Sequence, residues 1–372
     1  MRRRIALGLI ASLAALAALA TLPAGATVSG TNGKIVFGQN FPTYGFTINP
    51  DGSDEQQIGP AGSTSCSTWS PDSSKVLCSL WGPDDVPHPA TANPDGSDFT
   101  LLNPNLPLGL FCLDWAPDGT RLLCHAGGEM ANPSDGLYTV RSSDGGDLVR
   151  VTAQPADSFD DGYGYSPDGS RILFARFDAN DHGTLFSVEP DGSDPVQLSP
   201  PELSVFNIGF FDRVGADWSP AGSRVAFAAR KLSLGRFTTA LFVVNADGTD
   251  LHQITPSGVG ALSAQWSPNG ALIAFTSGCC GFPQVWVVHP DGTGIGRVTT
   301  AVDRAVFLTP VWSPDSTKLL FNRVDRHGET SLWTANTDGS GLSKLTDTIS
   351  HFATEEGTKS RAVYEWGSAP AN

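Results

Sequence analysis

Residues 115–119 read Trp-Ala-Pro-Asp-Gly and lead, three residues later, into the apolar run Leu122-Leu123-Cys124. Proline presets φ, aspartate hydrogen-bonds its own backbone, and glycine adopts φ values that other residues avoid, so this phrase predicts a tight turn between two strands. Similar phrases begin at Trp69, Tyr165, Trp218, Trp266 and Trp312, and neighbouring copies lie 46 to 53 residues apart. A repeated unit of about fifty residues therefore organises the chain.

A second turn phrase, Asp-Gly followed by a small residue, also recurs along the chain. It begins at Asp51, Asp95, Asp144, Asp191, Asp247, Asp291 and Asp338. Strand-like segments such as 285–288 precede it, and short ones such as 253–255 follow it. Each unit thus predicts four short antiparallel strands with a variable loop between the second and third. Four strands at this period are typical of a β-propeller blade, whereas a β-helix needs a shorter period and a helical solenoid needs helical patterning.

The number of blades depends on the two ends of the chain. Seven Asp-Gly turns but only six aromatic phrases are present, and the turn at Asp51 follows a strand-like segment at 34–37. Residues 361–366 resemble an innermost strand, and Trp366 lies 54 residues after Trp312. We therefore expect an all-β fold, a seven-bladed β-propeller of four-stranded antiparallel blades rather than a six-bladed one. The C-terminal strand would pair with the N-terminal strands, closing the ring and removing its sheet edges.

These phrases resemble the repeat of TolB-like (WD40-like, PD40-type) β-propeller proteins, typically written W-S-P-D-G, then an apolar strand and D-x-x-G. The resemblance extends from about Asn32 to Trp366. The repeat residues belong to the scaffold and do not specify chemistry. TolB itself carries an α/β domain before a six-bladed propeller, whereas here the repeats begin soon after the first segment. The resemblance therefore implies a stand-alone TolB-like propeller rather than a member of the Tol envelope machinery.

Residues 1–26 have the features of an export signal. Arg2, Arg3 and Arg4 precede an apolar run at 5–22, and Ala24-Gly25-Ala26 supplies a small-residue cleavage site. The alternative is a membrane anchor, because the run approaches the length that spans a bilayer. We expect cleavage, which leaves residues 27–372 as a single propeller domain with no membrane span. The protein is then expected to be secreted or periplasmic, and a monomer.

The composition agrees with a soluble, turn-rich β protein. The 372 residues include 41 Gly and 27 Pro, and 40% of the residues are hydrophobic, enough for a packed core. The net charge is −15 at pH 7. A surface of this sign disfavours binding to nucleic acid or to an anionic membrane.

Strand direction predicts two unlike faces. Because antiparallel neighbours alternate in direction, the Pro-Asp-Gly and Asp-Gly turns lie on one face (the turn face) and the irregular connections lie on the other (the loop face). Variable loops on a rigid scaffold commonly carry binding residues. The long loop-face segments are 81–92, 126–136, 200–214, 230–236 and 347–360. They and the neighbouring segment 160–161 carry the aromatics Trp81, Phe206, Phe210, Phe211 and Phe352, and the acids Asp84, Asp85, Asp160, Asp161, Glu355 and Glu356.

Two interpretations of these loop-face residues remain open. The aromatics either pack beneath their own loops or form a rim that holds a peptide or sugar chain. Arg230, Lys231 and Arg236 form one local basic patch among them.

Three histidines are candidate metal ligands. His125, His182 and His327 each follow a second strand, so they fall at or near the loop face, on different blades. Convergence near the axis would create a transition-metal site, as in some propeller lyases, but no spacing motif requires it, and scattered surface histidines are the alternative. The Asp-rich turns, by contrast, supply too few converging oxygens for calcium and are interpreted as hairpin turns. No cofactor is predicted.

Six cysteines in an exported chain predict disulfides. Cys66 and Cys112 each lie three residues before their Trp, and Cys78 and Cys124 each lie nine after it. Folding each hairpin about its turn places these residues opposite one another, within disulfide reach, which predicts Cys66–Cys78 and Cys112–Cys124. Cys279 and Cys280 are left for one another as a vicinal disulfide, with a free or metal-bound pair as the alternative.

The sequence contains no catalytic signature that we can identify. A Gly-x-Ser-x-Gly elbow, a phosphate-binding Gly loop and a His-Glu-x-x-His motif are all missing. The leading hypothesis is a non-catalytic exported propeller that binds a protein or polysaccharide of the cell envelope through its loop face. The alternatives are a metal-assisted polysaccharide lyase, or another enzyme, on the same scaffold and a purely structural envelope protein.

Overall fold

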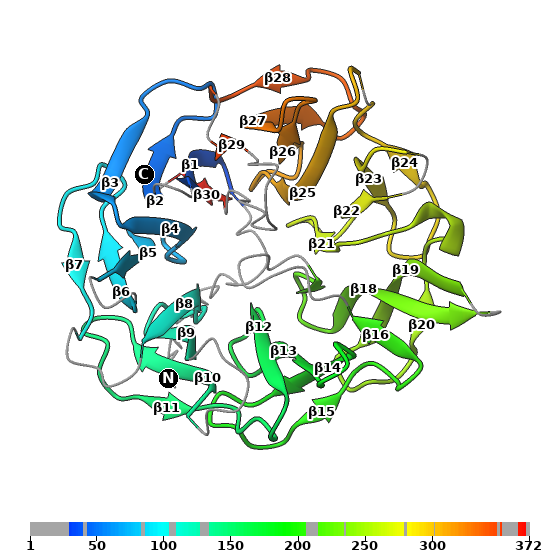
Figure 1. Ribbon diagram of the computed structural model, residues 1–372, viewed down its shortest axis with the longest axis horizontal. Coiled ribbons are helices and arrows are strands. Elements are labelled where there is room, and N and C mark those ends of the chain that lie inside the picture. The colour runs from blue at the N-terminus through cyan, green and yellow to red at the C-terminus, as the bar shows by residue number, and fades with distance from the viewer. Residues whose placement is uncertain are drawn as a thin grey trace, which may run out of the picture.

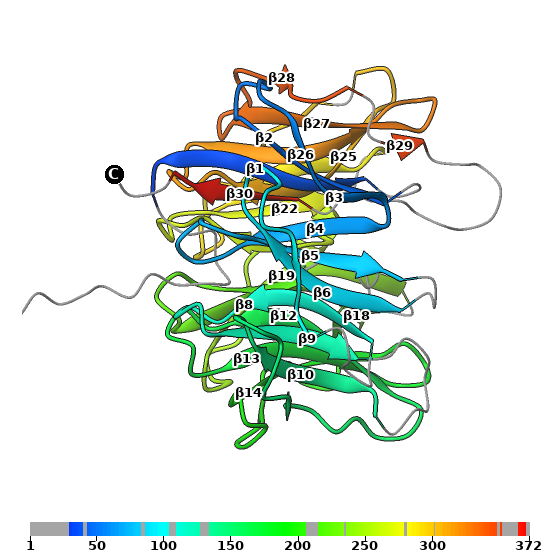
Figure 2. The same cartoon turned by 90° about the vertical axis from the view of Figure 1, so that its left-hand side faces the viewer.

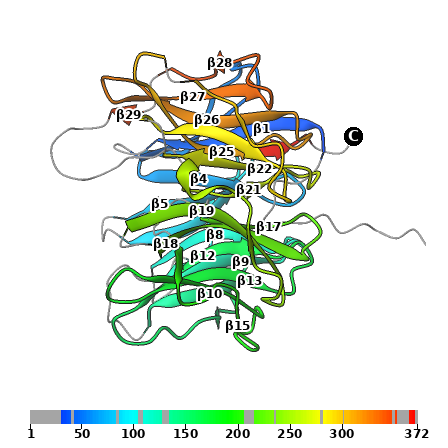
Figure 3. The same ribbon diagram turned by 90° about the vertical axis from the view of Figure 1, so that its right-hand side faces the viewer.

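The computed structural model describes residues 30–39, 43–82, 86–103, 109–126, 134–205, 215–233, 236–278, 281–300, 302–347, 350–351 and 364–369. Within these residues the chain is all-β apart from one turn of 3-10 helix, η1 (Ser257–Val259). Figure 1 shows the sheets arranged around a common centre, with β4, β8, β12, β21 and β25 nearest to it. Figures 2 and 3 show the same disc edge-on, with the strands running between its two faces.

Four of the sheets contain four antiparallel strands each, which confirms the predicted unit. In spatial order these strands are β3 (Gln56–Gly62), β2 (Thr43–Ile48), β1 (Asn32–Gln39) and β30 (Tyr364–Ser368); β4 (Thr64–Trp69), β5 (Val76–Trp81), β6 (Pro87–Ala92) and β7 (Thr100–Leu101); β8 (Leu110–Trp115), β9 (Arg121–Ala126), β10 (Gly136–Arg141) and β11 (Val149–Arg150); and β21 (Gln265–Trp266), β22 (Ile273–Ser277), β23 (Gln284–Val288) and β24 (Gly296–Arg297).

Two further sheets depart from this plan. A five-stranded sheet adds one short strand to the usual four, and contains β25 (Val306–Trp312), β26 (Lys318–Val324), β27 (Glu329–Asn336), β28 (Ser343–Lys344) and β29 (Ser350–His351). A nine-stranded sheet contains β12 (Phe159–Tyr165), β13 (Ile172–Phe177), β14 (Gly183–Val188), β15 (Val196–Gln197), β16 (Leu203–Val205), β17 (Ala216–Trp218), β18 (Arg224–Ser233), β19 (Arg236–Asn245) and β20 (His252–Gln253).

Strand β16 is what makes the nine-stranded sheet continuous. It pairs with β14 through Gly183 and Val205, and with β18 through Leu203–Lys231 and the two following pairs. Residues 200–214 were expected to form a loop, because a three-residue strand leaves no periodic signal in the sequence.

The two ends of the described chain meet in one sheet. Strand β30 pairs antiparallel with β1, and the facing residues include Ile35 with Trp366 and Phe37 with Tyr364. The same side chains continue into a buried cluster that also contains Val311 from β25. The predicted pairing of a C-terminal strand with the N-terminal strands is therefore present.

The hydrophobic core lies between neighbouring sheets. One cluster joins Leu77 of β5 to Trp115 and Tyr138 of the next sheet. Trp218, Trp266 and Trp312 are all fully or almost fully buried, so the aromatic of each repeated phrase is a core residue. Close packing of sheet against sheet sets the positions from which the connecting loops emerge.

The Pro-Asp-Gly phrase forms the predicted turn. After Trp115, the Asp118 Oδ1 atom accepts hydrogen bonds from the Thr120 N–H (2.9 Å) and hydroxyl (2.8 Å). Gly119 has φ +72°, a value that glycine adopts without strain. Arg121, at the start of the next strand, donates to Asp147 and Thr139 on the neighbouring turn and strand. This last contact ties the two turns of one sheet together.

Candidate functional site

The strand order confirms that the molecule has two unlike faces. In the sheet of β8 to β11, each strand pairs antiparallel with the next one in sequence. The first-to-second and third-to-fourth turns therefore lie on the turn face, and the other connections lie on the loop face. The described part of the chain contains no helix long and apolar enough to cross a membrane.

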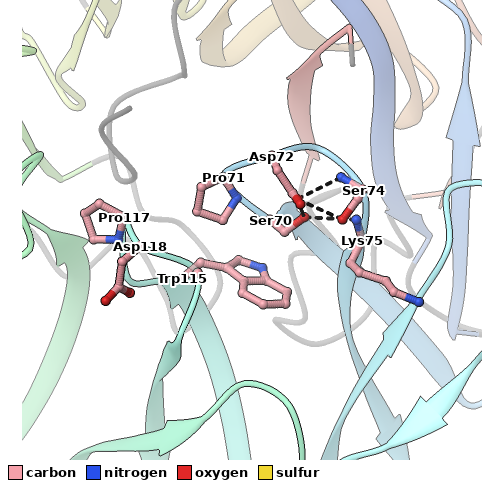
Figure 4. Close-up of a pocket in the computed structure, with 9 residues that line it drawn as sticks. Ser70, Pro71, Asp72, Ser74, Lys75, Trp115, Pro117 and Asp118 are labelled. Atoms are coloured by element: carbon pink, nitrogen blue, oxygen red, sulfur yellow. Dashed lines mark hydrogen bonds between the residues drawn. The ribbon is translucent and has the colours of Figure 1, made fainter. Parts of the chain in front are cut away.

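A pocket of about 440 Å³ lies on the turn face, between the β4–β5 and β8–β9 turns (Figure 4). Asp72 Oδ1 accepts hydrogen bonds from the Ser70 hydroxyl (2.7 Å), the Ser74 N–H (3.0 Å) and the Ser74 hydroxyl (2.8 Å). Lys75 Nζ donates to Asn93 Oδ1 at 2.7 Å. These polar groups already stabilise the turns, so the pocket does not present a catalytic pair. Its lining comprises Ser70, Pro71, Asp72, Ser74, Lys75, Trp115, Pro117, Asp118 and Gly119.

The Asp-rich turns behave as hairpin turns. Hydrogen bonds from the Ser53 hydroxyl and N–H hold the pKa of Asp51 below its usual range, and the turns at Asp95, Asp191 and Asp338 repeat this arrangement. Each of these carboxylates is thus bonded within its own turn. No three His, Cys, Asp or Glu side chains of the described residues are grouped so that they could hold a metal ion.

The three candidate histidines are not brought together. His125 lies on β9 and is 9% exposed. His182 lies in the β13–β14 turn, where its ring Nε2 donates to the Pro201 carbonyl at 3.0 Å. His327 lies in the β26–β27 turn, where its Nε2 accepts from Arg326 Nε at 3.0 Å. They lie on three separate sheets, and the described residues around them supply no converging ligand set.

The β18–β19 hairpin is the longest in the described chain and reaches the loop face (Figure 3). Near its tip, Phe237 is 68% exposed, and the Arg230 guanidinium lies 5.6 Å from the centre of its ring. Arg230 also donates to the Asp181 carbonyl (2.6 Å) and the Ser204 hydroxyl (3.3 Å). A cation fixed over an exposed aromatic ring forms an amphipathic contact site. Lys231, the next residue, is exposed, whereas the side chain of Arg236 lies outside the described residues.

Two more apolar side chains are exposed on the loop face. Phe282, between β22 and β23, is 40% exposed, and Val302, between β24 and β25, is 63% exposed. Their segments are linked, because the Phe307 N–H donates to the Pro283 carbonyl at 2.9 Å. Neither residue was predicted from the sequence, since a single apolar residue in a loop carries no periodic signal.

The expectation that Asp160 belongs to an exposed rim was wrong. Strand β12 begins at Phe159, so Asp160 lies inside the sheet and is fully buried. Its two carboxylate oxygens accept from Arg176 Nε at 2.6 Å and Nη2 at 2.7 Å, a bidentate ion pair. Trp81 is half-buried at the end of β5. The other rim candidates Phe206, Phe210, Phe211, Phe352, Asp84, Asp85, Glu355 and Glu356 lie outside the described residues.

The innermost strands carry acidic residues that sequence reasoning missed. The side chains of Asp114, Asp217 and Glu365 accept backbone hydrogen bonds from Tyr165 (3.1 Å), Trp266 (2.8 Å) and Trp69 (3.0 Å), respectively. In each case the acid immediately precedes a conspicuous aromatic and reaches the aromatic of the next unit. Burial raises the pKa of Asp217, and the negative charge of Asp114 raises it further. These acids are structural links between sequence units rather than a catalytic pair.

Both predicted hairpin disulfides are present. Cys66 is bonded to Cys78, and Cys112 to Cys124, each pair facing across two neighbouring strands. Cys279 and Cys280 lie outside the described residues.

The sheets arranged about one centre, the inter-sheet cores and the two-faced design define the class of β-propeller proteins. Several solved structures are similar in fold, among them the beta-propeller domain of the Trilobed protease from Pyrococcus furiosus, with a TM-score of 0.59 and 12% identity over 86% of this chain and 96% of that one. An oligogalacturonate lyase in complex with manganese matches with a TM-score of 0.63 and 13% identity, over 85% of this chain and 90% of that one. TolB from Acinetobacter baumannii matches with a TM-score of 0.51 and 14% identity, over 92% of this chain and 68% of that one. At these identities the likeness concerns the fold alone.

The sequence comparisons point to one family among propellers. Residues 211–356 match the model of the TolB beta propeller domain. The Tol-Pal system protein TolB of Syntrophus aciditrophicus is 34% identical over 92 residues, which are 25% of this chain and 18% of that protein. TolB of Anaeromyxobacter dehalogenans is 32% identical over 125 residues, 32% of this chain and 27% of that protein. The chain is therefore similar to the TolB β-propeller family over part of its length, and it spans only 18% to 27% of the length of these two relatives.

Proposed function

We propose that this protein is an exported, non-catalytic TolB-like propeller that binds a protein or polysaccharide of the cell envelope through its loop face. The observation that carries the proposal is Phe237, a large apolar side chain that is 68% exposed and is held under the Arg230 guanidinium near the tip of a long hairpin. Aromatic and arginine side chains in this arrangement are typical of binding surfaces.

The surroundings of Phe237 support a ligand that is not strongly basic. Arg230 and Lys231 are a local positive pair on a chain whose net charge is −15. Phe282 and Val302 add exposed apolar area on the same face. The ligand is expected to be a neutral or acidic envelope component, and the overall negative charge of the chain disfavours nucleic acid.

We propose seven blades in a closed ring. The nine-stranded sheet divides into β12 to β15 and β17 to β20, which are joined only through β16. Counting these as two blades and adding the other five sheets gives seven. The pairing of β30 with β1 supports closure, since the last strand of the chain then completes the first blade. Residues 27–372 would form this single domain.

We also propose that residues 1–26 are removed on export and that the mature protein is a secreted or periplasmic monomer. The two disulfides support an oxidising compartment. The first 29 residues lie outside the described chain, so the test is N-terminal sequencing of the mature protein, which should begin at Thr27.

No observation on the described residues favours the metal-assisted lyase hypothesis. His125, His182 and His327 lie on separate sheets without a converging ligand set among the described residues. The manganese of the oligogalacturonate lyase belongs to that protein, whose likeness to this chain is one of fold. The proposal of binding rests instead on the exposed Phe237 beside Arg230.

The binding proposal is tested by retention of envelope material on the immobilised mature protein. The loop-face variant combines Phe237→Ser with Val302→Ser, and the matched control combines Ile295→Ser with Leu342→Ser, which are 37% and 45% exposed on the turn face. We expect the loop-face variant to lose about tenfold or more of the retained material, a change of about 1.4 kcal/mol, and the control to behave as wild type. Equal retention by all three proteins would contradict the proposal.

A further inference from the structure

The outer edge of β19 has no strand paired with it near the loop face. Strand β19 pairs with β18 along its whole length, from Arg236 to Asn245. On its other edge it pairs with β20 only at Phe242 and Val243. The next contact towards the loop face is at Leu241, whose N–H donates to the Thr255 hydroxyl (2.9 Å) and whose carbonyl accepts from the Ile254 N–H (2.9 Å).

Beyond Leu241 the edge continues without a strand partner. Backbone groups of a strand alternate between its two edges, so Thr239 and Phe237 present their N–H and C=O groups to the same side as Leu241. Within the described chain, no backbone group outside β18 is hydrogen-bonded to residues 236–240. Helix η1 packs near β19 but does not form a ladder with it.

Two other sheets show what occupies the equivalent edge. Leu185 makes the same pair of contacts as Leu241, and Gly183, two residues earlier, pairs with Val205 of β16. Leu332 also makes these contacts, and Thr330, two residues earlier, pairs with Ser350 of β29. In both sheets an additional short strand extends this edge towards the loop face.

In two further sheets, the backbone carbonyl at the equivalent position accepts a hydrogen bond from a group that is not part of an added strand. Pro283, two residues before Val285, accepts the Phe307 N–H on its carbonyl at 2.9 Å. Asp135, two residues before Leu137, accepts the Arg150 guanidinium on its carbonyl at 2.9 Å. Thr239 therefore differs from four equivalent positions, each of which has a partner on this edge.

We propose that the edge at Phe237 and Thr239 is a strand-addition site, which takes an extended, acidic peptide segment of a partner protein. The proposal rests on the binding function proposed above and narrows its partner to a polypeptide. The added strand would hydrogen-bond to Phe237 and Thr239 as β16 does to β14 and β29 does to β27, a recognised mode of peptide binding.

The charges near the edge select an acidic peptide. Lys231 is exposed and makes no ion pair with a described residue, and the Arg230 guanidinium lies over the ring of Phe237. Both cations belong to β18, so β19 lies between them and an added strand, and their attraction for acidic side chains would act across β19. The rest of the chain is acidic, so this patch stands apart in sign.

The edge also lacks the usual protection against pairing. Residues 237–240 read Phe-Thr-Thr-Ala, with no proline and no charged residue, and all but the last favour strands. Exposed edges of natural sheets are ordinarily blocked by proline, charge or a bulge.

The first experiment selects twelve-residue peptides from a phage library on wild-type protein and re-tests them on Thr239→Pro. This substitution removes an N–H group that points outward, away from β18. An edge position tolerates proline for that reason, and the pairing of β19 with β18 stays in place. Thr239→Val keeps the N–H and is the matched control. We expect the selected peptides to be acidic and to bind wild type and Thr239→Val with equal affinity. Their affinity for Thr239→Pro should be lower by about tenfold or more.

The second experiment does not depend on the folding of a variant. The best selected peptide is synthesised with N-methyl groups on alternate residues, in each of the two phases. Strand addition predicts that one phase abolishes binding and the other retains it, and that peptide binding slows hydrogen exchange of the Phe237 and Thr239 amides. Equal effects of both phases, or no peptide that binds, would overturn strand addition. Envelope retention lost only in the loop-face variant would then still support the broader binding function.

Discussion

The carboxylate of Glu365 accepts a 3.0 Å hydrogen bond from the backbone N–H of Trp69, a residue 296 positions earlier in the chain. Gly367 lies against the same indole so closely that an added Cβ would come within 2.8 Å of the ring. The Tyr364 hydroxyl, on the same strand, forms a 2.6 Å hydrogen bond with the Thr309 hydroxyl. Strand β30 is thereby bonded both to the sheet of β4 and to that of β25.

This arrangement predicts that Glu365 matters for stability well beyond its position near the C-terminus. Glu365→Ala removes a charged acceptor from a partly buried N–H and should lower the free energy of unfolding by about 1.5 to 3 kcal/mol. Glu365→Gln keeps an oxygen acceptor and should cost less. Urea unfolding measures both, with Glu202→Ala at an exposed carboxylate as the control. Equal stability of Glu365→Ala and wild type would contradict the link.

The two classes of aspartate predict opposite responses to pH. Burial raises the pKa of Asp217, so its contribution to stability is complete below about pH 3.8 and is lost as pH rises through the raised value. Asp217→Asn keeps an acceptor for the Trp266 N–H but does not titrate. We expect the stability of wild type relative to this variant to fall from pH 4 to pH 8. A difference that is constant over this range would contradict the burial effect.

The turn aspartates titrate in the other direction. Partial burial raises the pKa of Asp168, but hydrogen bonds from the Ser166 hydroxyl and from the Ser170 N–H and hydroxyl lower it by more. The net effect is a pKa below the usual value. The contribution of Asp168 to the stability of the fold is therefore present above pH 3.8 and is lost as the pH falls through the lowered pKa. Asp168→Ala should cost about 1 kcal/mol at pH 7, a modest amount because the site is partly exposed to solvent.

The chain contains its own control for that prediction. Asn269 occupies the same place in its turn and accepts from the Ser267 hydroxyl (2.8 Å) and the Ala271 N–H (3.0 Å). Asp168→Asn should therefore preserve the turn and cost less than Asp168→Ala, while losing the acid dependence. If Asp168→Asn is as damaging as Asp168→Ala in thermal unfolding at pH 7, these hydrogen bonds are not what stabilises the turn.

Each disulfide closes a short hairpin, in which the two cysteines are 12 positions apart in the sequence. In the chain-entropy description, a loop of this size stabilises the folded state by about 2 to 3 kcal/mol. The pair of changes Cys112→Ala and Cys124→Ala should lower the melting temperature under oxidising conditions by several degrees. When dithiothreitol is added, the melting temperature of this variant should fall by less than that of wild type. A melting temperature that reductant does not change in wild type would show that the two bonds are unimportant for stability.

The repeat itself made the fold predictable from sequence. The aromatic-Ser-Pro-Asp-Gly phrase combines a buried ring, a turn with special backbone requirements and the start of a strand, and each of these leaves a local mark. The cysteine pairs were predictable for the same reason, because Cys66 and Cys78 occupy fixed distances from Trp69 on either side of one turn. Local chemistry repeated in phase thus encodes most of the scaffold.

The candidate site was less predictable, because it depends on contacts between units. The location on the loop face followed from strand parity, and the basic pair Arg230 and Lys231 was noticed, but the free edge of β19 was not. That edge is recognisable only by comparison with β14 and β27, whose extra partners β16 and β29 are two or three residues long. Asp160 was misplaced because its strand begins earlier than the apolar pattern indicates.

The most direct test of loop-face binding is site-specific photo-crosslinking in intact cells that express the protein. A benzophenone amino acid is placed at Phe237 and, in a separate variant, at Leu342 on the turn face, where the exposure is also substantial. We predict a discrete, protease-sensitive adduct at Phe237 and none at Leu342. Adducts of equal yield at both positions, or an adduct at Leu342 alone, would contradict binding through the loop face.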